Sequence, residues 1–281
     1  MEYGDKHILV LGAGASGIGA SWVLAQVGAH VVLNDYKPVT LPADEEKRLV
    51  SAGVDIITGR QDESLLDGVD RIVISPGISL DIPIVKAAQA RGIDVVSEVE
   101  VAYELSKSPI VAVTGTNGKT TTTTLLTKVL EGTGKPVRVG GNIGDSLSEV
   151  AYSMPADGFL VAELSSYQLE TIKHFRPIGA IMLNITPDHL ARHKTMENYI
   201  AAKERIFENQ LSTDFMVLNI DDPIVADMKH RAPSHILEIS QHQVVSNGAY
   251  YDKGQCYVTK NGMATPVIGS ADIHIPGSHN I

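Results

Sequence analysis

Residues 110–120 read Ile-Val-Ala-Val-Thr-Gly-Thr-Asn-Gly-Lys-Thr and join an apolar run to a polar turn that could bind phosphate. The β-branched run stops at Gly115, and Lys119 with Thr120 opens a segment that we expect to be a helix. Backbone N–H groups at such a turn bind anions, a lysine reaches the terminal phosphates, and a threonine hydroxyl can ligate Mg²⁺. A regular Walker A loop would have glycine where this chain has Val113. The context favours a nucleotide site over the alternative, a strand–helix turn rich in Gly, Asn and Thr.

A second glycine-rich turn, Gly12-Ala-Gly14-Ala-Ser-Gly17, follows the first apolar run of the chain. Asp35 ends the next apolar run, 18 residues after Gly17. This is the G-x-G-x-x-G spacing with an acidic residue where dinucleotide-binding βαβ units carry one. The turn could bind NAD, hold another nucleotide diphosphate such as UDP, or only pack a helix on a sheet. The residues alone leave these three readings open.

Polar residues also follow two later apolar runs. Glu163 ends the run that begins at Phe159, and an acid one strand from a phosphate loop commonly holds Mg²⁺. Without the phosphate loop, a solvated acid at a strand end would be an equal alternative. The polar segment 164–170 is interpreted as a ligand-facing turn and helix start. His189 follows the other run, and the preceding Thr186-Pro187 pair suits an N-cap and a first helical position. A lone histidine is more often structural, so its expected place at the sheet edge is what makes it a candidate.

Lys203 is a candidate because of its spacing within the expected helix 197–209. It lies four residues after Tyr199 and four before Phe207, which places it inside the apolar stripe of that helix. A lysine there must extend its amine to solvent, pair with an acid, or be modified. A carbamate formed with CO₂ would replace the cation with a carboxylate-like metal ligand.

Strands and helices alternate along the chain, which predicts an α/β fold with parallel sheets. We expect a Rossmann-like parallel-sheet domain over residues 1–105, and then a P-loop ATPase-like α/β domain over residues 106–281. A small β-hairpin region, with Lys-Gly and Asn-Gly turns between Tyr250 and Gly262, belongs to the second domain. The expected strands are 8–11, 31–34, 55–58, 71–75, 94–97, 110–114, 137–140, 159–163, 179–184 and 215–219. The expected helices of the first domain are 17–28, 43–52 and 82–91.

The composition of the 281 residues is that of a globular protein, with 43% hydrophobic residues and a formal net charge of −10. This charge argues against general affinity for nucleic acid or anionic membranes, so any phosphate ligand must be held locally. The single cysteine, Cys256, excludes an intramolecular disulfide and fits a reducing compartment. With no apolar stretch of about 18 residues, we expect a cytoplasmic protein.

Taken together and in order, these motifs resemble the Mur ligase family of peptidoglycan synthesis. The phosphate loop alone would also admit folylpolyglutamate synthase, which lacks the first domain. Ser75-Pro-Gly-Ile78, in a domain that also carries the Gly12–Gly17 turn, favours the member of the family that adds D-glutamate. The other motifs that carry the resemblance are Thr114-Gly-Thr-Asn-Gly-Lys-Thr120, Gly140-Gly-Asn142-Ile-Gly144, Glu163-Leu-Ser-Ser-Tyr-Gln-Leu-Glu170, Asn184-Ile-Thr-Pro-Asp-His189, Ala201-Ala-Lys203 and Gly277-Ser-His-Asn280.

The resemblance implies that the first domain binds the UDP of UDP-N-acetylmuramoyl-L-alanine, not NAD. Ala15 and Ser16 would approach the diphosphate, and Asp35 and Tyr36 would flank the uracil, with Lys37 where relatives often carry arginine. The residues implied for this substrate are Ala15, Ser16, Asp35, Tyr36, Lys37, Ser75, Pro76, Gly77, Asn142, Ser165 and Gln168.

The resemblance also implies ATP and two Mg²⁺ sites in the second domain. Thr120 and Glu163 would hold one Mg²⁺, and His189 with a carbamylated Lys203 would hold the other. The implied catalytic residues are Lys119, Glu163, His189 and Lys203. The residues implied for ATP are Gly115, Thr116, Asn117, Gly118, Lys119, Thr120, Thr121 and Asn280.

The implied reaction has two steps. ATP phosphorylates the carboxylate of the L-alanyl group, and the amine of D-glutamate then attacks the acyl phosphate to form an amide. Mur ligases have a third, C-terminal domain for the incoming amino acid. We therefore expect an incomplete second domain, a missing C-terminal domain, and a monomeric chain that binds the UDP substrate but does not ligate. The rival readings are an NAD-dependent oxidoreductase and a nucleotide-binding regulatory module.

Overall fold

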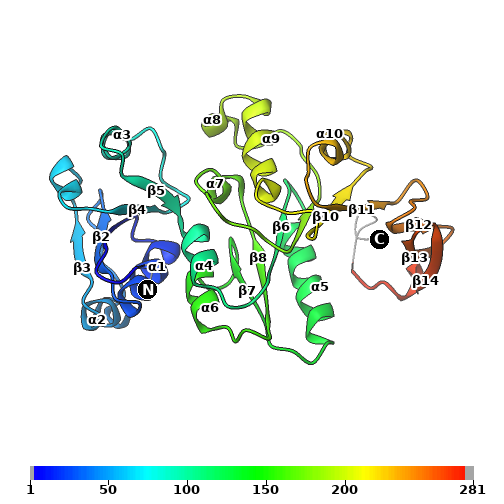
Figure 1. The fold of residues 1–281 in the computed structure, drawn as a ribbon, viewed down its shortest axis with the longest axis horizontal. Coiled ribbons are helices and arrows are strands. Elements are labelled where there is room, and N and C mark those ends of the chain that lie inside the picture. Colours follow the sequence, from blue (N-terminus) through cyan, green and yellow to red (C-terminus); the bar gives the residue numbers. More distant parts are fainter. Residues whose placement is uncertain (1–2, 276–281) are drawn as a thin grey trace. The chain divides into compact units, whose positions relative to one another are not determined.

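The computed structural model describes residues 3–275 and divides the chain into two compact units (Figure 1). One unit contains the described residues up to Ile110 together with Thr123–Phe175, and the other contains Val111–Thr122 and the described residues from Arg176 onward. None of the helices formed by residues 3–275 is long and apolar enough to cross a membrane. The predicted domain limits at residues 105 and 106 stay a prediction.

A five-stranded, fully parallel sheet lies in the first unit, with the strand order β3-β2-β1-β4-β5. This is the Rossmann-like order in which the chain starts at the centre of the sheet and winds outward in both directions. It confirms the predicted fold class of this part. The strands are β1 (His7–Leu11), β2 (His30–Asp35), β3 (Asp55–Thr58), β4 (Arg71–Ile74) and β5 (Asp94–Ser97), and the helices are α1 (Ala15–Gln26), α2 (Ala43–Ser51), η1 (Glu63–Leu66), α3 (Pro83–Ala90) and α4 (Glu98–Leu105).

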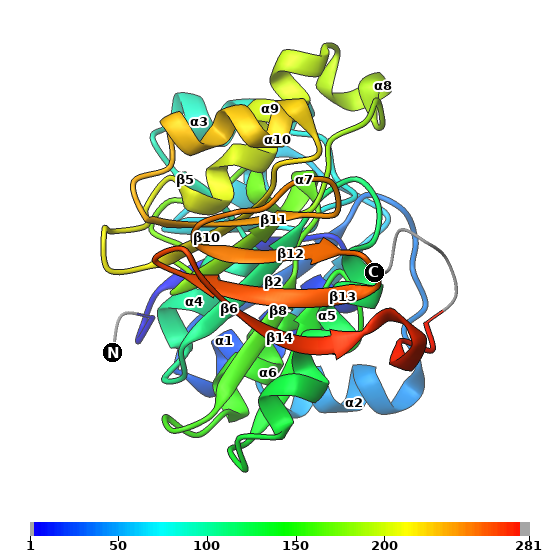
Figure 2. The same ribbon diagram turned by 90° about the vertical axis from the view of Figure 1, so that its right-hand side faces the viewer.

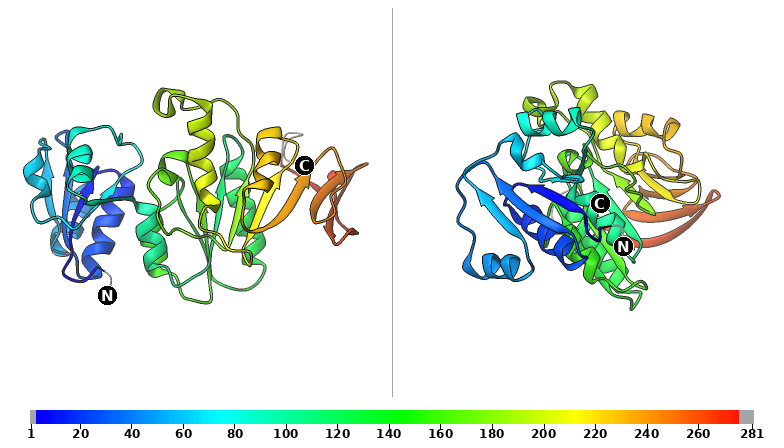
Figure 3. Two further views of the ribbon diagram at one scale, coloured as in Figure 1. Left: turned by 45° about the horizontal axis from the view of Figure 1, so that its top comes forward. Right: turned by 60° about the vertical axis from the view of Figure 1, so that its left-hand side comes forward.

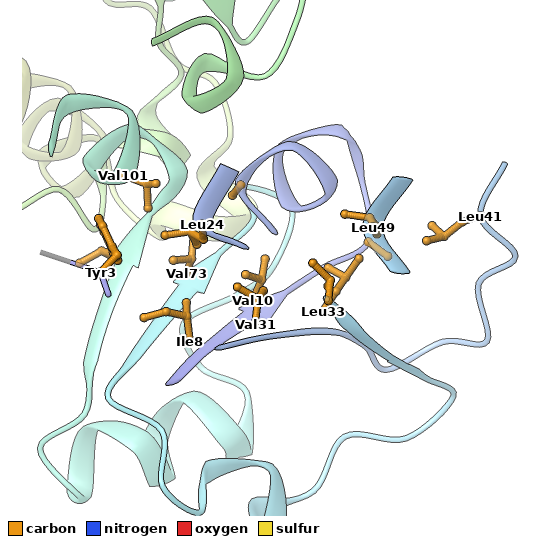
Figure 4. Close-up of a cluster of buried hydrophobic side chains, with 14 residues drawn as sticks. Tyr3, Ile8, Val10, Leu24, Val31, Leu33, Leu41, Leu49, Val73 and Val101 are labelled. Carbon is orange, nitrogen blue, oxygen red and sulfur yellow. The ribbon is translucent and has the colours of Figure 1, made fainter. Parts of the chain in front are cut away.

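Both faces of this sheet are buried, which explains why its strands read as continuous apolar runs. Alternate residues of β1 point to opposite faces. Ile8 and Val10 belong to a core formed with α1, α2 and α4, shown in Figure 4, while Leu9 and Leu11 pack with α3 and η1. The ribbon views place α1 and α3 on opposite faces of the strands (Figures 1 and 3).

The second sheet has nine strands in the order β14-β13-β12-β11-β10-β9-β6-β8-β7. Its strands are β6 (Ile110–Thr114), β7 (Val137–Gly141), β8 (Phe159–Glu163), β9 (Gly179–Met182), β10 (Phe215–Asn219), β11 (His235–Ser240), β12 (Gly248–Asp252), β13 (Gln255–Lys260) and β14 (Met263–Gly269). Its helices are α5 (Lys119–Glu131), α6 (Leu147–Ser153), α7 (Ser166–Leu169), α8 (Leu190–His193), α9 (Met196–Glu204), η2 (Arg205–Phe207), α10 (Pro223–Asp227), η3 (Met228–His230) and η4 (Ser270–Asp272).

The last three strands form the predicted β-hairpin region, where β12, β13 and β14 lie side by side and antiparallel (Figure 2). Both predicted turns are present. Lys253 and Gly254 have φ of 45° and 88°, and Asn261 and Gly262 have φ of 52° and 77°. Two successive positive φ values match the twist of a two-residue hairpin, which is why glycine and asparagine occur there.

Helix α4 was not expected. Its first residues, Glu98-Val-Glu100-Val-Ala, alternate polar and apolar side chains, a pattern typical of a strand. The structure buries both glutamates, so the alternation does not separate a core face from a solvent face.

Candidate functional site

The loop between β6 and α5 has the geometry of a phosphate-binding turn. Gly115 and Gly118 have φ of 151° and 83°, which favours glycine at both positions. A Cβ on Gly115 would lie 3.0 Å from the Cβ of Leu183 and 3.3 Å from the backbone nitrogen of Asn184. The loop therefore also packs closely against the segment that follows β9. Helix α5 begins at Lys119, as predicted.

Asn184 holds this loop in place, a role that the sequence analysis did not assign. Its Oδ1 accepts a hydrogen bond from the N–H of Asn117 at 2.8 Å, and its Nδ2 donates to the Asn117 carbonyl at 3.0 Å. Its own carbonyl accepts from the N–H of Thr116 at 2.9 Å. The available signal was a polar residue at the end of an expected apolar strand, but that signal does not separate a residue that holds a loop from one that contacts a ligand.

The ammonium of Lys119 lies over the same loop. Its Nζ donates to the carbonyls of Gly115 at 3.1 Å and Thr116 at 2.9 Å. Thr120 and Thr121 are exposed on the first turn of α5. The loop therefore places one cation and two hydroxyl groups at the N-terminus of a helix, where anions are favoured.

Lys203 lies in the apolar stripe of α9, as its spacing predicts, with 2% of the residue exposed. Its Nζ donates to the Gly115 carbonyl at 2.7 Å and lies 3.4 Å from the Thr114 hydroxyl oxygen. Burial, and secondarily the charge of Lys119, lowers the pKa of Lys203 from 10.5 to about 7, while Asp188 acts in the opposite direction. A large fraction of these amines is therefore neutral near pH 7, which is the form that reacts with CO₂.

Tyr199 connects Lys203 with the phosphate loop, and the sequence analysis gave it no role. Its side chain is buried, and the ammonium of Lys203 lies 5.0 Å from the centre of its ring. Its hydroxyl is 3.1 Å from the hydroxyl of Thr116. A tyrosine on an apolar stripe is normally interpreted as core, so only the fold identifies this contact.

His189 lies where the chain enters α8, but the predicted helix start before it is wrong. The helix begins at Leu190, not after Thr186, and His189 is its N-cap with φ of 54°. The reason is the left-handed backbone of His189, because a right-handed helix that began at Pro187 could not contain a residue with that conformation. The Nε2 of His189 lies 3.3 Å from a carboxylate oxygen of Asp188, and its ring stands edge-on to Tyr199 at 6.4 Å.

Glu163 ends β8 with its carboxylate buried. Its Oε1 accepts from the side chain of Asn142 at 2.8 Å, and its backbone carbonyl accepts from the Asn142 N–H at 2.8 Å. Gly141 has φ of 111°, and a Cβ there would lie 2.4 Å from the Glu163 carbonyl oxygen. The second oxygen, Oε2, is buried and has no hydrogen-bond partner among the described residues. A buried carboxylate oxygen without a donor is suited to a hard cation.

The polar segment after Glu163 forms the predicted helix start. Ser165 and Gln168 form a capping box on α7, in which the Ser165 hydroxyl accepts from the Gln168 N–H at 3.3 Å. The Gln168 Oε1 accepts from the Ser165 N–H at 2.9 Å and from its hydroxyl at 3.0 Å. The structure thus gives both side chains a local stabilising role, and their contact with a ligand stays a prediction.

The three glycines of the Gly12–Gly17 turn occupy different environments. Gly12 has φ of 100°, and its carbonyl accepts from the Ser75 hydroxyl at 3.2 Å. A Cβ on Gly17 would lie 1.8 Å from the Gly12 carbonyl oxygen, so helix and turn touch there. No described atom lies within 4 Å of a Cβ on Gly14, the N-cap of α1, and no described side chain caps that helix. The turn therefore opens at Gly14, with Ala15 exposed and Ser16 half-buried beside it.

Asp35 stabilises this turn through its carboxylate. One oxygen accepts from the N–H of Ala13 at 3.0 Å, and the other accepts from the N–H of Lys37 at 2.9 Å. Tyr36, which lies between Asp35 and Lys37 in the sequence, is 69% exposed. Pro76 and Gly77 follow Ser75 directly after β4. Contacts of these residues with a ligand stay predictions.

The predicted residues thus gather within each unit. In one unit the structure brings together the phosphate loop, Lys203 and His189. In the other, Ser75 joins the Gly12–Gly17 turn, and Asn142 joins Glu163. Asn280 lies outside the described residues.

Two sequence families match most of the chain. Residues 6–97 match the family described as Mur ligase MurD-like, N-terminal domain, and residues 113–281 match the Mur ligase middle domain. Curated relatives called UDP-N-acetylmuramoylalanine--D-glutamate ligase match the whole chain, with 45% identity in Thermoanaerobacter sp. (strain X514) and 42% in Halalkalibacterium halodurans. The chain spans 62% and 61% of the length of these two relatives.

Solved structures share the fold at lower identity. The UDP-N-acetylmuramate:L-alanyl-gamma-D-glutamyl-meso-diaminopimelate ligase from Neisseria meningitides aligns with a TM-score of 0.65 and 20% identity, covering 98% of this chain and 90% of that one. A murein peptide ligase from Psychrobacter arcticus aligns with a TM-score of 0.58 and 19% identity, covering 98% of this chain and 62% of that one.

Proposed function

Because the chain belongs to the Mur ligase family, we propose that it supplies the substrate-binding and ATP-binding parts of a ligase that adds D-glutamate to UDP-N-acetylmuramoyl-L-alanine. In this proposal residues 1–105 bind the UDP moiety and residues 106–281 bind ATP. Relatives whose name describes this ligase are 40–45% identical to the chain across its length. The protein would act as a monomer in the cytoplasm.

One observation carries the catalytic part of the proposal: the buried amine of Lys203 donates to Gly115 of the phosphate loop, and Lys119 extends over the same loop. A structural lysine would be expected to reach solvent or an acid. This lysine instead remains near the place where the terminal phosphates of ATP would bind. Its lowered pKa leaves an amine that can be converted to a carbamate.

The proposed reaction needs a leaving group, because a carboxylate is a poor electrophile. A carboxylate oxygen of the L-alanyl group attacks the γ-phosphorus of ATP, and ADP leaves. The amine of D-glutamate then attacks the acyl carbon, loses a proton, and displaces phosphate as the amide bond forms. Lys119 would neutralise the β- and γ-phosphates, while the loop amides and Asn142 orient the reacting groups.

Mur ligases use ATP together with Mg²⁺, and the donor set of this chain fits such a cation. Glu163 offers a buried oxygen without a hydrogen-bond donor, and Thr120 offers an exposed hydroxyl. His189 and a carbamate on Lys203 would form a second ligand set. When bound, Mg²⁺ would offset phosphate charge and polarise the acyl oxygen. Carbamate formation joins the neutral Lys203 nitrogen to the carbon of CO₂ and releases one proton.

Binding of MgATP tests the assignment of the phosphate loop. We expect Lys119→Ala to weaken MgATP at least about tenfold in calorimetric titrations, because a charged contact to phosphate is lost. Lys128→Ala is the matched control, since Lys128 lies on the same helix and pairs with Glu131 at 2.8 Å. Equal affinity in wild type and Lys119→Ala would overturn the assignment.

The carbamate has a spectroscopic test that does not depend on turnover. In ¹³C-bicarbonate, the wild-type chain should show a carbonyl resonance that is absent in Lys203→Ala and present in Lys128→Ala. A spectrum identical in all three proteins would contradict the carbamate. The expectation that this chain binds substrate without ligating is tested by incubation with ATP, Mg²⁺, UDP-N-acetylmuramoyl-L-alanine and D-glutamate, where amide product would refute it.

A further inference from the structure

The N-terminal end of α6 is bound to a buried carboxylate from α4. The Oε1 of Glu98 accepts from the Ser146 hydroxyl at 2.6 Å, from the Ser148 N–H at 2.8 Å and from the Ser148 hydroxyl at 2.9 Å. Glu98 is 2% exposed, and Ser146 and Ser148 are also buried. Three donors on one oxygen fix the position of this segment relative to α4.

The second carboxylate oxygen of Glu98, Oε2, differs from Oε1 in its hydrogen bonding. Oε2 is buried and accepts no hydrogen bond of normal geometry from the described residues. Burial raises the pKa of Glu98, and the donors of Ser146 and Ser148 oppose that shift. Ser16, the residue beside the open end of the Gly12–Gly17 turn, opposes that shift as well. Glu98 thus holds the α6 segment at Ser146, and the same Ser146 packs on Gly19 of α1, the helix that follows the turn proposed to bind the diphosphate.

Helix α6 also contacts α1 and α2. A Cβ on Gly19 of α1 would lie 2.2 Å from the Ser146 hydroxyl oxygen, so only glycine allows this approach. Arg48 of α2 pairs with Glu149 at 2.6 Å. Trp22 of α1 stands edge-on to Tyr152 at 6.0 Å. The approach of α1 and α2 to α6 is thus specified by packing and charge, while Glu98 of α4 supplies a buried polar contact to the same α6 segment.

The segment held by Glu98 continues directly into the loop that carries Asn142. Ser146 follows Asn142 by four residues, and the N–H of Gly141 donates to the Asp145 carbonyl at 3.2 Å, which closes the loop. At its other end, Asn142 is held by Glu163. The loop is therefore anchored by one buried glutamate at each end.

We propose that Glu98 is a positioning residue that fixes the Asn142 loop relative to the Gly12–Gly17 turn, so that one sugar nucleotide contacts both. The inference rests on the proposed function. It goes beyond that function by assigning a task to a residue that touches no ligand. The UDP moiety alone requires only the turn, whereas the complete sugar nucleotide requires the turn and the loop in register.

Comparing the affinities for UDP-N-acetylmuramoyl-L-alanine and for UDP distinguishes a positioning role of Glu98 from a merely structural one. We expect Glu98→Ala to weaken UDP-N-acetylmuramoyl-L-alanine about tenfold or more in calorimetric titrations, and to change the affinity for UDP less than about threefold. Glu98→Gln, which keeps an acceptor oxygen, should restore most of the lost affinity. If Glu98→Ala does not fold, Ser148→Ala removes one of its donors and should show the same selectivity to a smaller degree.

Glu100→Ala is the matched control. Glu100 lies two residues further along α4, is equally buried, and accepts from the N–H groups of Lys173, His174 and Phe175. Its loss should cost stability without selectivity between the two ligands. If Glu98→Ala and Ser148→Ala each weaken the affinity for both ligands by the same factor, the inference is overturned while the proposed function stays intact. A wild-type chain that binds neither ligand would overturn the proposed function, and the inference with it.

Discussion

At the residue scale, Lys203 and Tyr199 define the environment of the phosphate loop. Both lie on α9, four residues apart, and both contact the loop, one through an amine and one through a hydroxyl. The amine is the more consequential group, because its protonation state changes between the folded and the unfolded chain.

The buried lysine predicts how stability depends on pH. The pKa of Lys203 is about 7 in the folded chain and 10.5 when unperturbed, so between these values the unfolded chain binds more protons. The unfolding free energy of the wild type should therefore rise relative to Lys203→Met by up to about 1.4 kcal/mol per pH unit from about pH 7 to pH 10. Below about pH 7 the charged, buried amine imposes its full penalty, and the difference should be flat. Chemical denaturation in CO₂-free buffer measures both. A difference that does not vary with pH would mean that Lys203 is not desolvated.

The hydroxyl of Tyr199 predicts a loop-specific defect. Tyr199→Phe removes the contact with Thr116, so we expect the unfolding free energy to fall by about 1 kcal/mol and MgATP affinity to fall about fivefold. Tyr152→Phe is the control, since Tyr152 is 40% exposed on α6, and it should leave MgATP affinity unchanged. Unaltered MgATP binding in Tyr199→Phe would show that this hydroxyl does not support the loop.

Sequence reasoning located the groups with unusual chemistry more readily than the groups that hold them. Lys203 was identified because a lysine on an apolar stripe conflicts with its surroundings. Tyr199 and Asn184 fit their surroundings, so nothing in the sequence distinguished them from core and loop residues. The left-handed conformation of His189 likewise could not be read from the sequence, because a positive φ is uncommon outside glycine.

At the element scale, the central strands β1, β4, β6 and β8 were predictable because they are almost fully buried and read as apolar runs. β3, β5, β6, β8 and β10 have the predicted bounds. The hairpins were predictable from Lys-Gly and Asn-Gly, whose positive φ values the turns require. Helix α4 was missed because its glutamates are buried in protein, where each accepts hydrogen bonds from distant segments.

The contact between α1 and α6 gives an element-scale prediction that opposes helix propensity. Alanine normally stabilises a helix interior relative to glycine by about 0.5–1 kcal/mol. Gly19→Ala should instead destabilise the chain by about 1–3 kcal/mol, because the added Cβ overlaps the Ser146 side chain.

Gly14→Ala is the comparison for this substitution. A Cβ on Gly14 meets no described atom within 4 Å, so the unfolding free energy should change little. Its binding of UDP-N-acetylmuramoyl-L-alanine should weaken, since the turn opens at Gly14 and we propose that the diphosphate binds there. Urea denaturation and calorimetry give both quantities. Equal stability of Gly19→Ala and the wild type would contradict the close approach of α1 to α6.

At the scale of the whole molecule, the net charge of −10 means that anionic ligands gain nothing from the general field of the protein. Binding must come from local donors: two glycine-rich turns, the helix ends that follow them, and a few placed lysines. Both turns combine a positive-φ glycine with a helix that starts soon after it, at Ala15 after Gly12 and at Lys119 after Gly118. We therefore predict two anion sites of different specificity, one for a uridine diphosphate and one for a nucleoside triphosphate.

The proposed function is tested most directly by the ligand specificity of the Gly12–Gly17 turn, because the same glycine spacing also occurs in NAD-binding proteins. The measurement is the thermal midpoint of the 281-residue chain with UDP-N-acetylmuramoyl-L-alanine and, separately, with NAD at the same concentration. A ligand at about 100 times its Kd adds about 2.7 kcal/mol, enough to raise the midpoint by several degrees. If the first turn binds a uridine diphosphate, the sugar nucleotide should raise the thermal midpoint by this amount, and NAD should raise it less or not at all. A larger rise with NAD would contradict the proposed function.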